Sequence, residues 1–270
     1  MCGADLSVWL EGWDRGAAPG RLVEGLTGLE LEDVERAGDR WAQIDCPSRL
    51  VHHTHAVAGF ARQAVSRAPD GRVAIGLPCS PRGLAGAEEL LWRGISVGVG
   101  PVSTTATWRA VAQRFIRALE RRRAVGLPVD DIACVAWVPV GLIDDHSDPF
   151  LARGSPLRGA AGIAVAQLLY LLAFQTLADQ RWAELRAHGA QPPRLGWNRL
   201  TAERRADYVS RLTLPGSVIA LRHPWASEIE GHELNVTEAD ETEAQWTSRE
   251  LIREGVPLDR ILGRLEAKAA

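Results

Sequence analysis

The sequence predicts an α/β fold, a TIM-type (β/α) barrel formed by a single domain over residues 1–270. Two observations support this prediction. Short apolar runs bounded by turn residues alternate with helical patterns along the chain, and each run is nearly continuous in apolar residues. Strands of that kind are typical of a parallel sheet covered by helices on its outer face. A closed βα barrel is the simplest form of such a sheet.

Six strands are expected, each followed by a helical pattern. The expected strands are Gln43–Pro47, Arg72–Pro78, Ser96–Val102, Ala133–Val140, Arg194–Asn198 and Ser217–Arg222. The expected helices are Leu50–Arg67, Gly83–Trp92, Thr105–Ala124, Leu157–Ala187, Ala202–Leu212, Ala239–Glu254 and Leu258–Ala267. In Thr105–Ala124 the apolar residues recur at helical spacing with arginines between them, which predicts an amphipathic helix facing a core.

The first 42 residues are interpreted as a helical N-terminal segment, followed by βα repeats over 43–238 and C-terminal helices over 239–270. Helical spacing relates Leu6, Trp9, Leu10 and Trp13, and helical patterns follow at Arg21–Leu26 and Glu32–Trp41. A complete barrel of this type needs eight strands. Six visible strands therefore indicate either an N-terminally truncated barrel or a misread N-terminal segment.

The charge and the apolar pattern exclude two classes of partner. The net charge is −3 and the pI is about 6.2, so no nucleic-acid partner is expected. The arginines at 121–123 end a predicted helix, where cations favour the helix dipole. The longest apolar stretch, Ala160–Leu177, contains two glutamines and is expected to be a buried helix, so no membrane partner is expected. Without a cleavable signal, the protein is expected to be cytoplasmic.

No metal or other cofactor is expected. Cys2, Cys46, Cys79 and Cys134 do not show a paired metal spacing and are expected to be reduced thiols. The histidines of His52–His55 and the acidic run Asp144–Asp148, which is predicted to be a loop, do not follow a known zinc spacing either. A solvated surface is the preferred interpretation of both, with a metal site as the alternative.

Several motifs from about Leu22 onward resemble the transaldolase family in order and spacing. Ile44–His52 resembles a family strand that ends in glutamate and continues as Pro-Arg-Leu-Ala-His. Arg72–Leu84 resembles the Ile-Lys-Val-Pro-Ala-Thr-x-x-Gly-Leu strand and turn, and Glu88–Val97 resembles a helix followed by Gly-Ile-x-Val-Asn-Val-Thr. Further matches in the family's order are Val135–Asp144, Leu157–Ala164 and Arg194–Trp197. The resemblance covers most of the chain and implies a class I aldolase-type barrel.

The resemblance also implies that several family groups are absent. Gly76 stands where the family has the lysine that forms an imine with the substrate, and glycine offers no nucleophile. Gly98–Gly100 replaces an Asn-Val-Thr strand, and Gly141–Leu142 replaces a Ser/Gly-Arg dipeptide that holds a sugar phosphate. The Ser-Asn-Pro-Thr loop has no counterpart before Gln43. The only lysine is Lys268, and arginine is not a usable imine-forming amine. Transaldolase activity is therefore not expected.

Candidate site residues lie where strands end, because function in a βα barrel resides at those ends. Asp45 replaces the family's acid-base glutamate and Asp144 aligns with a family aspartate. The candidate catalytic residues are Asp45, Asp144 and His52, with a histidine as the acid-base partner of Asp45. Asp45 as a helix cap or arginine partner is the alternative.

Six further residues are candidates for substrate binding. They are Gly76, Cys79, Trp137, Asn198, Arg199 and Arg222. Cys79 is either a thiolate near a helix N-terminus or an inert buried thiol. Trp137 stands where the family has a small polar residue, so we expect it to fill the former substrate space.

Two hypotheses about function remain open. The first is a lysine-independent aldol-type, cyclisation or proton-transfer reaction on a non-phosphorylated small molecule of secondary metabolism. The second is a pseudoenzyme that acts as a binding or assembly partner, as a homodimer or with another protein. An ordered apolar pocket with converging acids favours the first, and a filled barrel mouth together with a large exposed apolar edge of the sheet favours the second.

Overall fold

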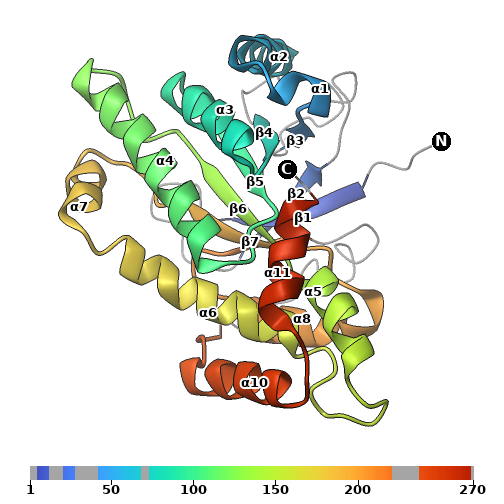
Figure 1. Cartoon of the computed structure of the whole chain (residues 1–270). Helices are drawn as coiled ribbons and strands as arrows, with labels where there is room; N and C mark the ends of the chain where they lie inside the picture. The colour runs from blue at the N-terminus through green and yellow to red at the C-terminus, as the bar shows by residue number, and fades with distance from the viewer. Residues whose placement is uncertain (1–4, 12–20, 28–41, 68–72, 221–236, 269–270) are drawn as a thin grey trace.

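The computed structural model describes residues 5–11, 21–27, 42–67, 73–220 and 237–268. In these residues eight strands form one sheet in the order of the sequence (Figure 1). The strands are β1 (Asp5–Glu11), β2 (Arg21–Thr27), β3 (Ala42–Asp45), β4 (Val73–Pro78), β5 (Ser96–Gly100), β6 (Cys134–Pro139), β7 (Arg194–Asn198) and β8 (Val218–Ile219). Strands β2 to β8 run parallel, and β1 is antiparallel to β2. Because β1 lies beside β8, the sheet curls into a barrel, and the predicted α/β barrel is confirmed.

The six predicted strands are present as β3 to β8. The helical interpretation of the N-terminal segment is wrong for residues 5–11 and 21–27, which form β1 and β2. Their ladder runs in register from the Asp5–Thr27 pair to the Glu11–Arg21 pair, so the backbone groups that the two strands turn toward each other are paired. A short apolar spacing does not distinguish a helix from a strand, and here the long-range pairing decides. Trp13 and Glu32–Trp41 lie outside the described residues.

The helices follow the strands as the sequence predicts, but two of the predicted long helices are each divided into two helices. Their bounds are α1 (Ser48–Val51), α2 (Thr54–Arg67), α3 (Pro81–Trp92), α4 (Thr105–Ala124), α5 (Val140–Ser147), α6 (Ala161–Thr176), α7 (Gln180–Ala187), α8 (Arg205–Leu212), α10 (Glu241–Arg253) and α11 (Leu258–Ala267), with 3-10 turns η2 (Asp148–Phe150) and η3 (Ala202–Arg204). The predicted helix Leu50–Arg67 is interrupted between α1 and α2. The predicted helix Leu157–Ala187 breaks before α7, because Asp179 accepts a hydrogen bond from the Trp182 amide at 2.8 Å and begins a new helix.

The acidic run Asp144–Asp148 is not the predicted loop. It forms the second half of α5 and the start of η2, directly after β6. The apolar residues before it, Val140 and Ile143, are fully buried, and this burial holds the segment as a helix against the strand ends.

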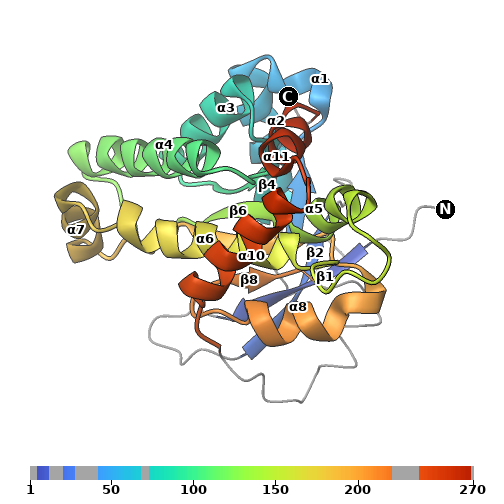
Figure 2. The ribbon, with the colours of Figure 1, turned by 60° about the horizontal axis from the view of Figure 1, so that its bottom comes forward.

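The barrel has an outer and an inner apolar core. Helices such as α3, α4, α6 and α8 lie around the strands (Figures 1 and 2), and the large core cluster lies between them and the sheet. A separate small cluster of Val135, Trp137 and Val218 fills part of the inside of the barrel. The inner cluster belongs to the strands alone, so it determines what space the barrel interior offers.

Candidate functional site at the inner face of the barrel

Glycines at inward positions of three strands make room for large side chains inside the barrel. Alternate strand residues face the same side of the sheet. A Cβ atom added to Gly98 would lie 1.9 Å from Oε1 of Gln43 and 2.8 Å from Nε1 of Trp137, and one added to Gly196 would lie 2.5 Å from the Trp137 ring. Close approach of this kind is a common reason for glycine within a strand. The interior is therefore occupied by Trp137 and Gln43.

Three polar side chains form a hydrogen-bonded chain across this interior. The indole N–H of Trp137 donates to Oε1 of Gln43 at 2.7 Å, and Nε2 of Gln43 donates to Oδ1 of Asp45 at 3.1 Å. Trp137 and Gln43 are buried, whereas Asp45 is exposed. The chain thus runs from the closed interior to a solvent-accessible carboxylate, which can still accept a proton or a hydrogen bond.

Gly76 lies directly beside that carboxylate. It pairs with Asp45 in the register of β3 and β4, and a Cβ atom added to Gly76 would lie 1.9 Å from Oδ1 of Asp45 and 2.9 Å from Nε2 of Gln43. Any side chain at this position must displace Asp45 or Gln43. The space next to Gly76 is therefore filled by its neighbours.

Asp144 lies away from this network and braces helices. Its Oδ1 accepts from the Gly162 amide of α6 at 2.7 Å, and its Oδ2 accepts from the Tyr208 hydroxyl of α8 at 2.6 Å. Burial raises the pKa of Asp144 to about 6, although both hydrogen bonds oppose that shift. These contacts assign Asp144 a role in holding α5, α6 and α8 together.

His52 lies on the exposed surface at the end of α1, where its Nδ1 pairs with the guanidinium of Arg82 from α3. Asp45 instead receives its hydrogen bond from Gln43. These contacts do not bring the two residues together as an acid-base pair. His52 follows the last residue of α1, whereas His55 lies in the first turn of α2, so the two histidines do not belong to one helix.

The end of β7 carries two of the predicted binding residues. Asn198 is half-buried, and its Oδ1 is enclosed without a hydrogen bond to a described residue. Arg199 has a φ of 57°, a left-handed conformation, and its carbonyl oxygen approaches Gly141 so closely that a Cβ there would lie 1.9 Å away. Gly141 therefore has a packing reason for lacking a side chain. Arg222 lies outside the described residues.

The three described cysteines are buried free thiols. Cys79 is buried, and burial raises its pKa to about 12, with a smaller contribution from Glu266. Burial raises the pKa of Cys134 to about 12 as well, and that of Cys46 to about 11. Because the thiolate is the nucleophilic form, the buried-thiol interpretation of Cys79 is favoured over the reactive one.

Sequence reasoning missed Gln43, although it links the other two members of the network. Its signal was a polar residue two positions before Asp45, which puts both on the same face of β3. Gly196 was missed for a similar reason, since a glycine inside an apolar strand indicates close approach of another group.

Two further properties concern only the described part of the chain. No group of three or more histidine, cysteine or acidic residues is placed to hold a metal ion there. No single helix in the described residues has the length and apolar character of a membrane span. The pair α6 and α7 has that length and apolar character when the two are taken together, but they meet at a bend of 79°.

The fold defines an α/β barrel whose described inner side chains, Gln43 and Trp137, pack against each other, and comparison with known proteins gives the family. No protein-family model matches the chain. A transaldolase of Parafrankia sp. is 30% identical over 223 residues, which are 76% of this chain and 60% of that protein. A transaldolase of Thiobacillus denitrificans is 28% identical over 88% of this chain and 69% of its own length. A transaldolase of Saccharopolyspora erythraea is 26% identical over 93% and 74%.

The chain is therefore a relative of the transaldolases, as the motifs of its strands predict. It spans only about three fifths of the length of the first of these proteins.

Proposed function

We propose that this chain is a transaldolase relative that does not form a lysine Schiff base and that acts as a binding or assembly partner, with a second copy or another protein. The observation that carries the proposal is the position of Trp137. Its ring lies against Gly196, and its indole N–H is bonded to Gln43, so the described side chains of the inner face form a packed core where a substrate pocket would otherwise lie. A filled interior meets one of the two expectations for the non-catalytic hypothesis. The other, an exposed apolar sheet edge, is not met by the described strands, because β1 lies beside β8.

The lysine content supports the same proposal. The only lysine in the sequence is Lys268, which is exposed at the end of α11. The strand positions available to an imine-forming amine are therefore lysine-free from β1 to β8. A carbonyl substrate has no such amine to attack it inside the barrel.

A second candidate function rests on the exposure of Asp45. Its carboxylate is held by one hydrogen bond from Gln43 and remains open to solvent, which suits a general base or acid. This geometry favours a lysine-independent aldol-type, cyclisation or proton-transfer step on a non-phosphorylated small molecule, in cytoplasmic secondary metabolism. The absence of His52 from the Asp45 hydrogen bond makes it the weaker candidate.

The proposal is tested by trapping with borohydride in the presence of a ketose phosphate, followed by intact-mass measurement. We expect no mass increase in the wild type and no transfer of a three-carbon unit to an aldose phosphate. The Gly76→Lys variant is also expected to be inactive, because Leu142 stands where the resemblance implies a phosphate-binding arginine. Adduct formation that disappears in Lys268→Arg would overturn the proposal, and so would transfer activity in either form.

Native mass spectrometry of the protein purified from its own host separates the two candidates. A dimer or a co-purifying protein without a small molecule supports the binding role. A released small molecule whose retention is lost in Asp45→Asn, but not in Asp131→Asn, supports the lysine-independent enzyme instead.

A further inference from the structure

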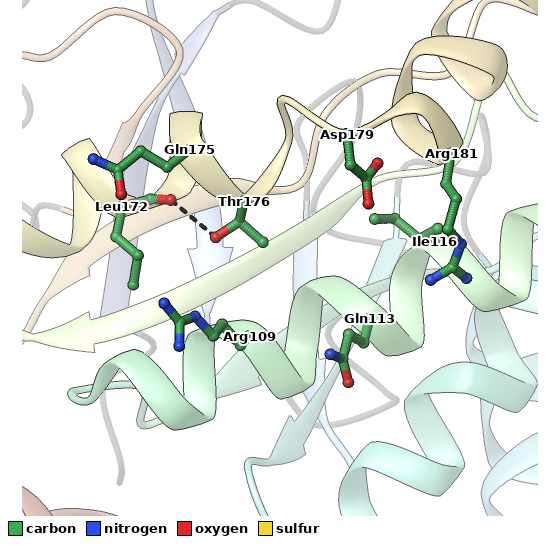
Figure 3. Close-up of a pocket in the computed structure, with 8 residues that line it drawn as sticks. All are labelled: Arg109, Gln113, Ile116, Leu172, Gln175, Thr176, Asp179 and Arg181. Atoms are coloured by element: carbon green, nitrogen blue, oxygen red, sulfur yellow. Dashed lines mark hydrogen bonds between the residues drawn. The ribbon is translucent and has the colours of Figure 1, made fainter.

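A hollow of about 230 Å³ lies on the outside of the barrel, between α4 and the junction of α6 with α7 (Figure 3). It exists because α6 ends at Thr176 and the chain turns by 79° into α7. Thr176 is fixed at this edge, since its hydroxyl accepts from Nε1 of Trp108 at 3.2 Å and donates to the Leu172 carbonyl at 2.9 Å. The wall of the hollow is therefore held in place from both sides.

Three polar side chains that line the hollow have no partner among the described residues. They are Arg109 and Gln113 of α4 and Gln175 of α6, and all three are exposed to solvent. Arg109 and Gln113 lie one helical turn apart, so both belong to one face of α4. By contrast, Arg181 at the far end is already paired with Glu120 through bonds of 2.7 and 2.6 Å. The free positive charge of the hollow is thus that of Arg109.

Asp179 also lines the hollow at its α7 end, where its Oδ1 accepts a hydrogen bond from the Trp182 amide at 2.8 Å and its negative charge limits the anionic charge that the hollow can take. Two apolar side chains form the rest of the wall. Ile116 is 3% exposed and Leu172 is partly buried against the core. One free guanidinium, two free amides and an apolar wall in one small hollow are the elements of a small-molecule site. The volume is below the ~300–1,000 Å³ of sites for drug-sized ligands, which restricts the occupant to a small metabolite.

We propose that this hollow binds a small organic acid. The guanidinium of Arg109 pairs with the carboxylate, the amides of Gln113 and Gln175 bond to a hydroxyl or amide of the same molecule, and its carbon chain lies against Ile116 and Leu172. The C-terminal end of α6 lies beside the site and carries a partial negative charge. A monoanionic carboxylate is therefore accommodated better than a phosphate dianion.

This site uses no residue of the barrel interior. It therefore does not depend on whether the inner face is catalytic, and either outcome of the trapping experiment leaves it open to its own test.

The test uses calorimetric titration of the full chain with three probes: succinamate, its neutral analogue succinamide, and inorganic phosphate. We expect saturable binding of succinamate and at least tenfold weaker binding of the other two. Arg109→Gln is expected to weaken succinamate binding at least tenfold, because a charge-assisted hydrogen bond is lost. Arg62→Gln, the same change at an exposed arginine of α2, is the matched control and is expected to bind like the wild type.

Three results would overturn the proposal. One is the lack of saturable succinamate binding by the wild type. Another is equal affinity for succinamate and succinamide, which would remove the role of charge. The third is equal weakening in Arg62→Gln and Arg109→Gln, which would indicate general surface attraction. Tighter binding of phosphate than of succinamate would assign the hollow to a phosphate ligand and would equally contradict the carboxylate.

Discussion

At the scale of single residues, the inner face of the barrel is determined by side chains that are missing as much as by those present. Gly98 and Gly196 leave the space that Trp137 occupies, and Gly76 leaves the space beside Asp45. The buried Oε1 of Gln43 would be unsatisfied without the indole N–H, which makes each member of the network depend on the next. Substitutions in this network should therefore change the free energy of unfolding by amounts that the burial of each residue alone does not predict.

Adding one methyl group to these glycines should destabilise the protein to different degrees. In Gly98→Ala the new Cβ meets the buried side chains of Gln43 and Trp137, so we expect a loss of about 1–3 kcal/mol. Gly76→Ala should cost less, because the exposed Asp45 can rotate away. Gly59→Ala in α2 meets nothing within 4 Å and should be neutral or stabilise by roughly 0.5–1 kcal/mol. Guanidinium unfolding of the three variants checks this order, and equal stability of Gly98→Ala and Gly59→Ala would contradict it.

Removing the indole N–H should destabilise the protein beyond the loss of ring volume. Trp137→Phe leaves the buried Oε1 of Gln43 without its donor, which should cost about 1–3 kcal/mol. Trp182→Phe is the matched control, because Trp182 is equally buried and its indole nitrogen has no hydrogen bond to a described residue. The difference between the two variants in urea unfolding isolates the hydrogen bond. No difference would mean that Trp137 acts through packing alone.

At the scale of elements, distant helices are joined at their ends by carboxylates. Glu266 of α11 reaches the start of α4, where its Oε1 accepts from the amides of Ser103 and Thr104 at 2.8 and 2.9 Å and from the Thr107 hydroxyl at 2.7 Å. Asp144 does the same between α5 and α6. A negative charge at a helix N-terminus is favourable because it meets unpaired amides and the positive end of the helix dipole.

Loss of the Glu266 carboxylate should loosen α11. Glu266→Ala removes the acceptor of several hydrogen bonds, so we expect a loss of about 2–4 kcal/mol, and Glu266→Gln should lose roughly half as much. Glu250→Ala on α10 removes only a surface pair with Arg253 and should change stability by less than about 0.5 kcal/mol. Unfolding curves and the rate of proteolysis at α11 measure the effect. A Glu266→Ala variant as stable as Glu250→Ala would exclude this role.

At the scale of the whole molecule, the closed sheet separates two regions with different chemistry. Its interior is a small packed core that connects through Gln43 to an exposed acid. Its outer surface carries the helices, and these leave a polar hollow between α4 and the bend after α6. Asp144 lies at a junction of three helices, so its ionisation affects the stability of the whole barrel.

Stability should depend on pH through Asp144. Its pKa is about 6 in the folded protein and 3.8 as the ordinary value, so the folded state binds the proton more tightly. The stabilisation that this tighter proton binding gives the folded state is fully present below pH 3.8 and is lost as the pH rises through 6. Its loss lowers the free energy of unfolding by roughly 3 kcal/mol. We expect Asp144→Asn to gain that amount relative to the wild type between pH 4 and pH 7. Comparing the two proteins in urea at both pH values cancels the other titrating groups, and a constant difference would contradict the assignment.

The sequence by itself determined the alternation of strands and helices. The apolar runs that became β3 to β8 are continuous, and the helix over Thr105–Ala124 has one apolar face, so local pattern alone was sufficient. The family relationship was also predicted from the sequence, because the order of motifs along a chain does not depend on how the chain folds. Gly76 and Trp137 were recognised as unusual residues for their positions.

Only the tertiary structure decided which residues meet. The pairing of β1 with β2 overrode a helical pattern, because long-range hydrogen bonds outweigh local spacing in short segments. The tertiary structure also places Asp144 at a helix junction and His52 beside Arg82. In the barrel interior, it makes Gln43 the link between Trp137 and Asp45. The physical reason is that contacts across a closed sheet join residues far apart in the chain, and periodicity within one segment carries no information about them.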